Sequence, residues 1–155
     1  MRSIGRYGIV SVVLAVVTLA GCADNGARPA SEPERFQSAR ALCRTLEGAR
    51  LWERTELYFG LSKPDGSLVS DADYQRFLDT EVTPRFSDGF TLLGGNGQFR
   101  GTSGEIIREP TRIVLLLYPF DAAKSAAVEE IRAAYRKQFQ QESVLRADAP
   151  SCVGF

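Results

Sequence analysis

Three polar side chains stand at alternate positions of one short segment: Arg54, Glu56 and Tyr58. Side chains that alternate in this way share one face of a β-strand. A carboxylate between a guanidinium and a phenol can bind a small polar ligand, and it can act as a general base if it is desolvated. We expect Arg112 to join this cluster from a neighbouring strand. The alternative interpretation is a structural ion pair with a tyrosine hydrogen bond.

The rest of the chain offers little other chemistry. It contains no histidine, which excludes a Ser-His-Asp triad and removes the commonest general base and metal ligand. Asp71 and Asp73 follow Ser70 in the pattern of a helix N-cap, so capping is predicted rather than calcium binding. The glycine cluster at 94–97 lacks the Lys-Ser/Thr of a phosphate loop and is predicted to be a bulge or bend in a strand. The sequence therefore predicts no metal and no cofactor, with Glu56 as the catalytic candidate.

The N-terminal segment has the pattern of a secretory leader, with Arg2 and Arg6 before an apolar run over 9–20. The run is shorter than the ~20 apolar residues that span a bilayer. It closes on Leu-Ala-Gly-Cys at 19–22, a string that resembles a bacterial lipoprotein signal. The resemblance implies removal of residues 1–21 and acylation, as with palmitate, of Cys22. The alternative is a conventional signal peptide in which Cys22 is a bystander.

The rest of the chain is predicted to hold one domain on a tether. Residues 22–33 are polar, contain two prolines and can reach about 18–20 Å, and a single α+β domain is expected over 34–155. The near-neutral charge and the lack of basic clusters argue against nucleic acid as a partner. We expect a protein held by its lipid on the periplasmic side of the cell envelope. Ala23 is not the acidic residue of an inner-membrane retention signal, which favours the outer membrane where the cell has one.

Two further cysteines remain, Cys43 and Cys152, near opposite ends of the domain. An oxidising compartment favours a disulfide between them, which would close a loop of about 110 residues and add roughly 3–5 kcal/mol of stability. A redox pair is one alternative, although the chain has no Cys-x-x-Cys spacing. Two free thiols are the other, and secreted proteins seldom keep them.

Periodicity and turn residues predict the order of the elements. They are a short helix over 34–46, a strand over 54–61, a helix after Ser70, a strand over 90–100, a strand in two parts around Pro110 that ends at Tyr118, a helix from Asp121 to about Gln140, and a last strand over 143–146. After the first helix this is the βαββαβ order of the ferredoxin-like fold, with a four-stranded antiparallel sheet and two helices on one face. An irregular α+β sheet with another strand order is the alternative.

The strand over 111–118 is apolar on both sides, as in strands that are buried on both faces. Because two helices cover only one face of such a sheet, we expect either the helix at 34–46 or a second copy to cover the other. This second face is expected to be an interface or a lidded pocket. The residues assigned to it are Arg54, Glu56, Tyr58, Val114, Leu116 and Tyr118.

Three segments carry a resemblance to a known family: RTELYFGL at 54–61, EVTPRF at 81–86 and QESVLR at 141–146, with Cys152 near the end. Together they resemble an uncharacterised bacterial family catalogued as domain of unknown function 3574. The resemblance covers residues 43–155, with Phe99 where the family is expected to have tryptophan. It implies no activity.

These observations favour a lipid-anchored binding or interaction module of the cell envelope. Its expected partners are the membrane, through the N-terminal lipid, and an envelope protein, a small ligand or a second copy. The rival hypothesis is a small enzyme without histidine or metal that uses Glu56 with Tyr58 and Arg54.

Overall fold

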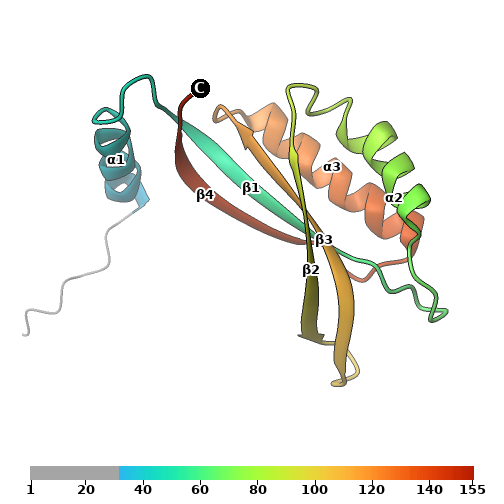
Figure 1. The fold of residues 1–155 in the computed structure, drawn as a ribbon. Coiled ribbons are helices and arrows are strands. Elements are labelled where there is room, and N and C mark those ends of the chain that lie inside the picture. Colours follow the sequence, from blue (N-terminus) through green and yellow to red (C-terminus); the bar gives the residue numbers. More distant parts are fainter. Residues whose placement is uncertain (1–31) are drawn as a thin grey trace, which may run out of the picture.

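The computed structural model describes residues 32–155, which form one sheet with helices on one side (Figure 1). The predicted leader 1–21, Cys22 and all but the last two residues of the tether lie outside this range. The elements are α1 (Glu32–Cys43), β1 (Arg50–Gly60), α2 (Asp71–Phe77), the π-helical turn η1 (Leu78–Val82), β2 (Thr91–Arg100), β3 (Ile106–Tyr118), α3 (Ala122–Phe139) and β4 (Leu145–Val153).

The sheet has the strand order β2-β3-β1-β4, and every neighbouring pair is antiparallel. The central pair, β1 and β3, is therefore made of strands that are separated in sequence by α2 and β2. Figure 1 shows α2 and α3 together on one face of this sheet. This is the predicted ferredoxin-like arrangement, preceded by a short N-terminal helix.

Both main helices begin at the predicted caps. The Ser70 hydroxyl accepts a hydrogen bond from the backbone N–H of Asp73 at 3.1 Å, and it donates to the Asp73 carboxylate. The Asp121 carboxylate accepts from the N–H of Ala123 at 2.7 Å. These bonds satisfy amide groups that have no partner inside the first helical turn.

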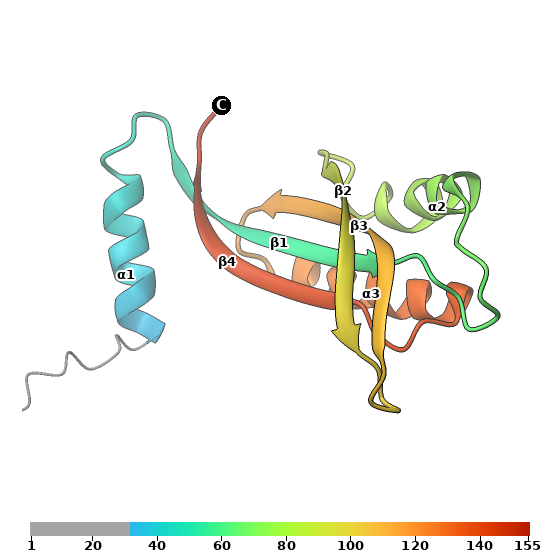
Figure 2. The same cartoon turned by 60° about the horizontal axis from the view of Figure 1, so that its bottom comes forward.

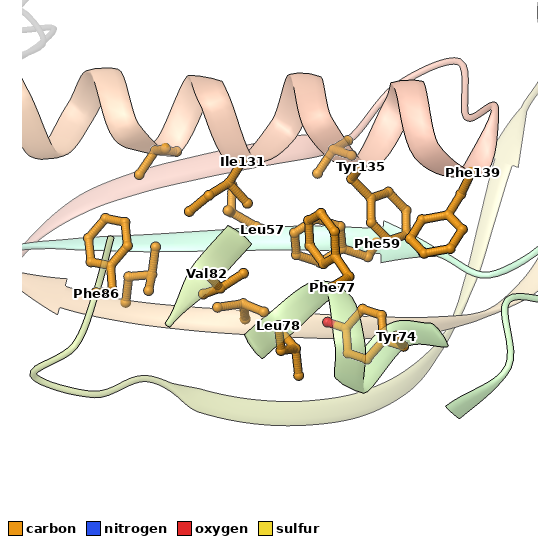
Figure 3. Packing of buried hydrophobic residues seen from close by; sticks show 14 of the residues in the cluster. Leu57, Phe59, Tyr74, Phe77, Leu78, Val82, Phe86, Ile131, Tyr135 and Phe139 are labelled. Carbon is orange, nitrogen blue, oxygen red and sulfur yellow. The ribbon is translucent and has the colours of Figure 1, made fainter. Parts of the chain in front are cut away.

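The core lies between the sheet and these helices, and it is rich in aromatic rings (Figure 3). Phe59 of β1 lies against Tyr135 of α3 and Phe77 of α2, with ring centroids 4.6 and 5.7 Å apart. Their edge-to-face geometry is the one that aromatic pairs prefer. The two helices contribute the predicted apolar stripes, all of them buried: Tyr74, Phe77, Leu78 and Val82, then Val128, Ile131, Tyr135 and Phe139.

The predicted bend in the second strand is wrong, because β2 pairs with β3 without interruption from Thr91 to Arg100. Its glycines instead make room for side chains of β3. A Cβ on Gly97 would lie 2.7 Å from the hydroxyl of Thr111. The two predicted parts of β3 are also one strand, because β3 pairs with β2 without interruption through Pro110, which lies opposite Asn96.

The outer ends of the sheet differ from the prediction as well. The strand β1 begins at Arg50 instead of Arg54, and β4 runs to Val153 because the expected tail pairs with β1 as far as Arg50. At the other end, the first part of β3 pairs only with β2. The two strands leave the sheet there as a two-stranded arm (Figure 1).

A disulfide joins Cys43 at the end of α1 to Cys152 in β4, with the two Cα atoms 5.2 Å apart. Figure 2 shows α1 beyond the end of β1 and β4, away from the other two helices. Helix α1 therefore does not cover the second face of the sheet, which was one of the two predicted covers.

Candidate functional site

The predicted cluster on β1 forms as expected from the strand alternation. The Arg54 guanidinium lies 2.5 Å from one carboxylate oxygen of Glu56, and the Tyr58 hydroxyl donates a hydrogen bond to the other. The bond from Tyr58, together with the charge of Arg54, holds the pKa of Glu56 below its usual range. A carboxylate stabilised in its ionised form is a weak base, so this geometry favours positioning and charge pairing over proton transfer.

Four other predicted members, Val114, Leu116, Tyr118 and Arg112, lie on the opposite face, so the assignment of one shared face is wrong. Val114 pairs directly with the core residue Leu57 and is fully buried. Leu116 pairs directly with Thr55, which puts it on the side that the helices cover, and it is fully buried. Tyr118 lies on the same side and bonds to Thr55. Arg112 also points toward the helices, where it binds the Asp71 carboxylate at 2.8 Å. Alternation within β3 was predicted correctly, but its register against β1 is opposite to the expected one.

The structure instead places a polar cavity on the helix side, where β1 and β4 pass the beginning of α3. Its volume is about 350 Å³, and it is lined by Glu53, Tyr118, Phe120, Asp121, Ala122, Ser125 and Arg146. These residues come from four parts of the chain that the fold brings together. Of the predicted candidates, the cavity contains only Tyr118.

A chain of hydrogen bonds supports the floor of this cavity. The hydroxyl of Thr55, which is fully buried, donates to the Asp148 carboxylate at 2.5 Å. It lies 2.8 Å from the Tyr118 hydroxyl, which must be the donor of that bond because the Thr55 proton is already used. Burial raises the pKa of Tyr118, so the phenol keeps its proton.

Arg146 is held in place from several sides. Its guanidinium binds the carboxylates of Asp148 at 2.8 Å and of Glu129 at 2.9 Å, and it donates to the hydroxyl of Ser125 at 3.0 Å. Two anions therefore compensate its charge. Because Glu53 and Asp121 also line the cavity, the groups around it carry a net negative charge.

Among the carboxyl groups that line this cavity, Glu53 is the one whose pKa is raised. Burial raises its pKa, the nearby charge of Asp148 raises it further, and Arg146 opposes both effects. A carboxyl group of raised pKa in a cavity can accept or donate a proton nearer to neutral pH than an ordinary glutamate can. The cavity thus combines a tunable acid, a fixed cation and two aromatic side chains.

A second hollow of about 400 Å³ lies on the arm formed by β2 and β3, lined by Asn96, Gly97, Gln98, Arg108, Glu109 and Pro110. Three of its four polar side chains, those of Gln98, Arg108 and Glu109, are already used by the fold. Arg108 donates to Gln98 at 2.8 Å, and Glu109 accepts from the N–H of Ser62 at 2.8 Å. We therefore take the cavity at Glu53 as the candidate site.

Sequence reasoning missed Glu53, Phe120, Ser125 and Asp148. The signal for Glu53 is its place in β1 on the same side as the core residues Thr55 and Leu57, where a charged group is unusual. That signal required the strand to begin before Arg54. The others could be found only from the sheet order, which sets β4 beside β1.

The sequence of this chain matches the model of a known protein family. The model of the family described as "Protein of unknown function (DUF3574)" matches residues 54–155. The chain belongs to this family. The match includes Asp121, Arg146 and Asp148, and it begins one residue after Glu53. No curated protein matches the chain.

Two solved structures share the fold of this family member. A phage SAM lyase in complex with S-methyl-5'-thioadenosine has a TM-score of 0.54 and 13% identity, and the match covers 67% of this chain and 90% of that one. A phage SAM lyase in the apo state has a TM-score of 0.50 and 15% identity, with coverage of 71% and 93%. At such identities the likeness shows the fold alone. Within residues 32–155, no helix is both long and apolar enough to span a membrane.

Proposed function

We propose that this protein is a lipid-anchored, extracytoplasmic binding domain and that its ligand occupies the cavity beside Glu53. The observation that carries the proposal is the convergence in that cavity of Glu53, Arg146 and Tyr118 from three strands. A concave site with a few convergent polar groups and an altered pKa is the usual form of a small-molecule site. The network through Thr55 and Asp148 fixes the polar groups before a ligand arrives.

The charge of the cavity favours a ligand with a positive group. Glu53 and Asp121 line it, while the charge of Arg146 is compensated by Asp148 and Glu129. The aromatic side chains of Tyr118 and Phe120 suit a flat or apolar body next to that cation. A small organic cation with hydroxyl or amine donors therefore fits best. The solved neighbour that holds S-methyl-5'-thioadenosine, an uncharged molecule, gives weaker support for a small-molecule site and none for the positive group.

A second candidate function is catalysis at the same cavity, and the raised pKa of Glu53 favours it. Glu53 would then act as the general base or acid. This assigns the enzyme hypothesis to Glu53 instead of Glu56. The low pKa of Glu56 makes that residue a poorer base.

Binding can be tested by isothermal titration of the intact, detergent-solubilised protein. The probes are S-methyl-5'-thioadenosine and spermidine, which separate a nucleoside from a simple polycation. We expect at least one probe to saturate a single site and Glu53→Gln to weaken it about tenfold, because the variant keeps the shape of the side chain but removes its charge. The control is Glu47→Gln, an exposed carboxylate in the loop after α1. Saturation that is insensitive to Glu53→Gln, or no saturation by either probe, would contradict the proposal.

The anchor is tested separately. The string Leu-Ala-Gly-Cys at 19–22 supports acylation of Cys22 after cleavage. Mass spectrometry of the protein from membranes should find Cys22 at the N-terminus, carrying acyl chains, and Cys22→Ser should release the protein from the membrane fraction. An unmodified Cys22 inside an intact mature chain would show that a conventional leader is present instead.

A further inference from the structure

The sheet face opposite α2 and α3 carries few charges, and no helix among residues 32–155 covers it. At one end, the ring of Phe155 contacts that of Trp52, with centroids 5.6 Å apart. We call this side of the sheet the open face and define it by the pairing of the four strands. Its members are Trp52, Arg54, Glu56 and Tyr58 of β1, Thr91 and Leu93 of β2, Ile113, Leu115 and Leu117 of β3, and Leu145, Ala147 and Ala149 of β4. Leu145 is 61% exposed and Leu93 is 47% exposed. Depletion of charge around an aromatic and aliphatic centre is typical of protein interfaces.

The two charges on the open face are arranged so that the face can complement itself. Arg54 and Glu56 stand two positions apart on β1. Two copies can pack face to face with their β1 strands antiparallel. A two-fold axis beside Thr55 then places Arg54 of each copy over Glu56 of the partner subunit. With parallel strands, Arg54 would face Arg54 of the partner subunit. The charge pattern thus selects the antiparallel arrangement.

The same axis matches three further pairs of residues, and it leaves Thr91, Leu93, Ile113 and Leu145 without a counterpart among the members. It sets Tyr58 against Trp52 of the partner subunit, which makes two aromatic pairs by symmetry. On β3 it sets Leu115 against Leu117 of the partner subunit, because these two lie opposite Glu56 and Arg54 in the sheet. On β4 it sets Ala147 against Ala149 of the partner subunit in the same way. Packed sheets keep their strands within about 30° of alignment, which preserves these matches.

From this coincidence we propose that the open face binds the open face of a second copy, with the two β1 strands antiparallel across a two-fold axis beside Thr55. The members span seven residues of β1, five each of β3 and β4, and three of β2. At about 3.3 Å per residue and about 4.8 Å between strands, the outline is roughly 320 Å². This is below the roughly 800 Å² per partner of a standard interface, so the contact that we propose is a small one. The cavity at Glu53 lies on the other side of the sheet, so the two proposals stand independently.

Charge reversal tests the arrangement directly. Two differently tagged copies of the full-length protein are expressed together, extracted from membranes in mild detergent and purified through one tag. Wild-type copies should co-purify. Copies that both carry Arg54→Glu, or both carry Glu56→Arg, should co-purify at least about tenfold less, because four like charges then meet in the interface. A mixture of one Arg54→Glu copy with one Glu56→Arg copy should co-purify again.

The mixed pair is decisive because neither copy in it regains its own internal ion pair. The like-charged pairs also measure how often two lipoproteins share one micelle by chance. Labelling of free thiols checks that each variant keeps the disulfide between Cys43 and Cys152, and Leu46→Asp in the loop after α1 serves as a charged surface control. Wild-type copies that do not co-purify would overturn the proposal. Mixed variants that pair no better than the like-charged ones would overturn the contact between the two faces. Mixed variants that co-purify far better than wild-type copies would overturn the antiparallel register, because only parallel strands set like charges together in the wild type.

Discussion

The hydroxyl of Tyr118 donates to that of Thr55 across 2.8 Å on the side of the sheet that the helices cover. Thr55 passes the bond on to Asp148, whose carboxylate also holds Arg146. One buried hydroxyl therefore connects the centre of the sheet to the wall of the cavity. Networks of this kind hold their members rigidly when every group is satisfied, and they become costly when one group is removed.

Thr55→Val should lower the free energy of unfolding by about 1–3 kcal/mol, although the two side chains have the same shape. The variant leaves the hydroxyl of the buried Tyr118 without its acceptor, and it removes one donor from the partly exposed Asp148 carboxylate. Urea unfolding followed by circular dichroism measures the change. Thr83→Val, at an exposed position after η1 and outside the open face, is the control and should change little. Equal effects of the two substitutions would mean that the network contributes nothing.

Replacement of Cys43 and Cys152 by serine should loosen α1 first. The disulfide joins positions 109 residues apart, and this helix lies beyond the end of the sheet (Figure 2). We expect the free energy of unfolding to fall by up to about 4–5 kcal/mol, and the amides of α1 to exchange with solvent faster than those of β1. Ser151→Ala is the control next to the bond. Unchanged protection of α1 in the double variant would contradict this prediction.

Two buried tyrosines should respond to loss of the hydroxyl in opposite directions. Among residues 32–155, the Tyr74 hydroxyl is buried without a hydrogen-bond partner, whereas that of Tyr135 donates to the carbonyl of Gly60 at 2.8 Å. Tyr74→Phe should therefore leave stability unchanged or raise it by about 1 kcal/mol, and Tyr135→Phe should lower it by about 1 kcal/mol. Urea unfolding of both variants tests the contrast. Destabilisation by Tyr74→Phe equal to that by Tyr135→Phe would refute it.

Much of the fold could be predicted because its signals are local. Ser70 and Asp121 mark helix starts by capping chemistry, and the apolar stripes follow the helical period. The register of β3 against β1 is not local, since α2 and β2 separate the two strands. Strand alternation says only that Leu116 and Leu115 point to opposite sides. Which of them shares a face with Glu56 depends on pairing, and a shift of one residue reverses the answer.

The cavity could not be predicted for the same reason. Glu53 and Arg146 lie far apart in sequence and meet because β4 pairs with β1 in a given register. The glycines of β2 mislead in another way. A cluster at 94–97 is typical of a bend, but here Gly97 leaves space for the side chain of Thr111 on the adjacent strand. The residues at 94–97 alone do not show that a side chain on the adjacent strand requires this space.

Glu53→Gln should make the protein more stable at neutral pH and change little in acid. The pKa of Glu53 is raised in the folded protein, mainly by burial and then by the charge of Asp148. A carboxyl group with a raised pKa favours the folded state below the pKa of the unfolded chain. That contribution is lost as the pH rises through the folded pKa. Glutamine does not ionise, so the variant does not lose this stability as the pH rises. The free energy of unfolding of the variant should therefore exceed that of the wild type above about pH 4.

Glu129→Gln provides the control with the opposite sign. Hydrogen bonds from Arg132 and then Arg146 lower the pKa of Glu129, so its contribution is present at neutral pH and disappears as the pH falls through the folded value. This variant should therefore be less stable than the wild type at pH 7, and the two should converge in acid. Chemical unfolding between pH 3 and pH 8 measures both differences. If Glu53→Gln also lowered the free energy of unfolding at pH 7, the fold would stabilise the Glu53 carboxylate. The assignment of Glu53 as the tunable acid of the cavity would then fail.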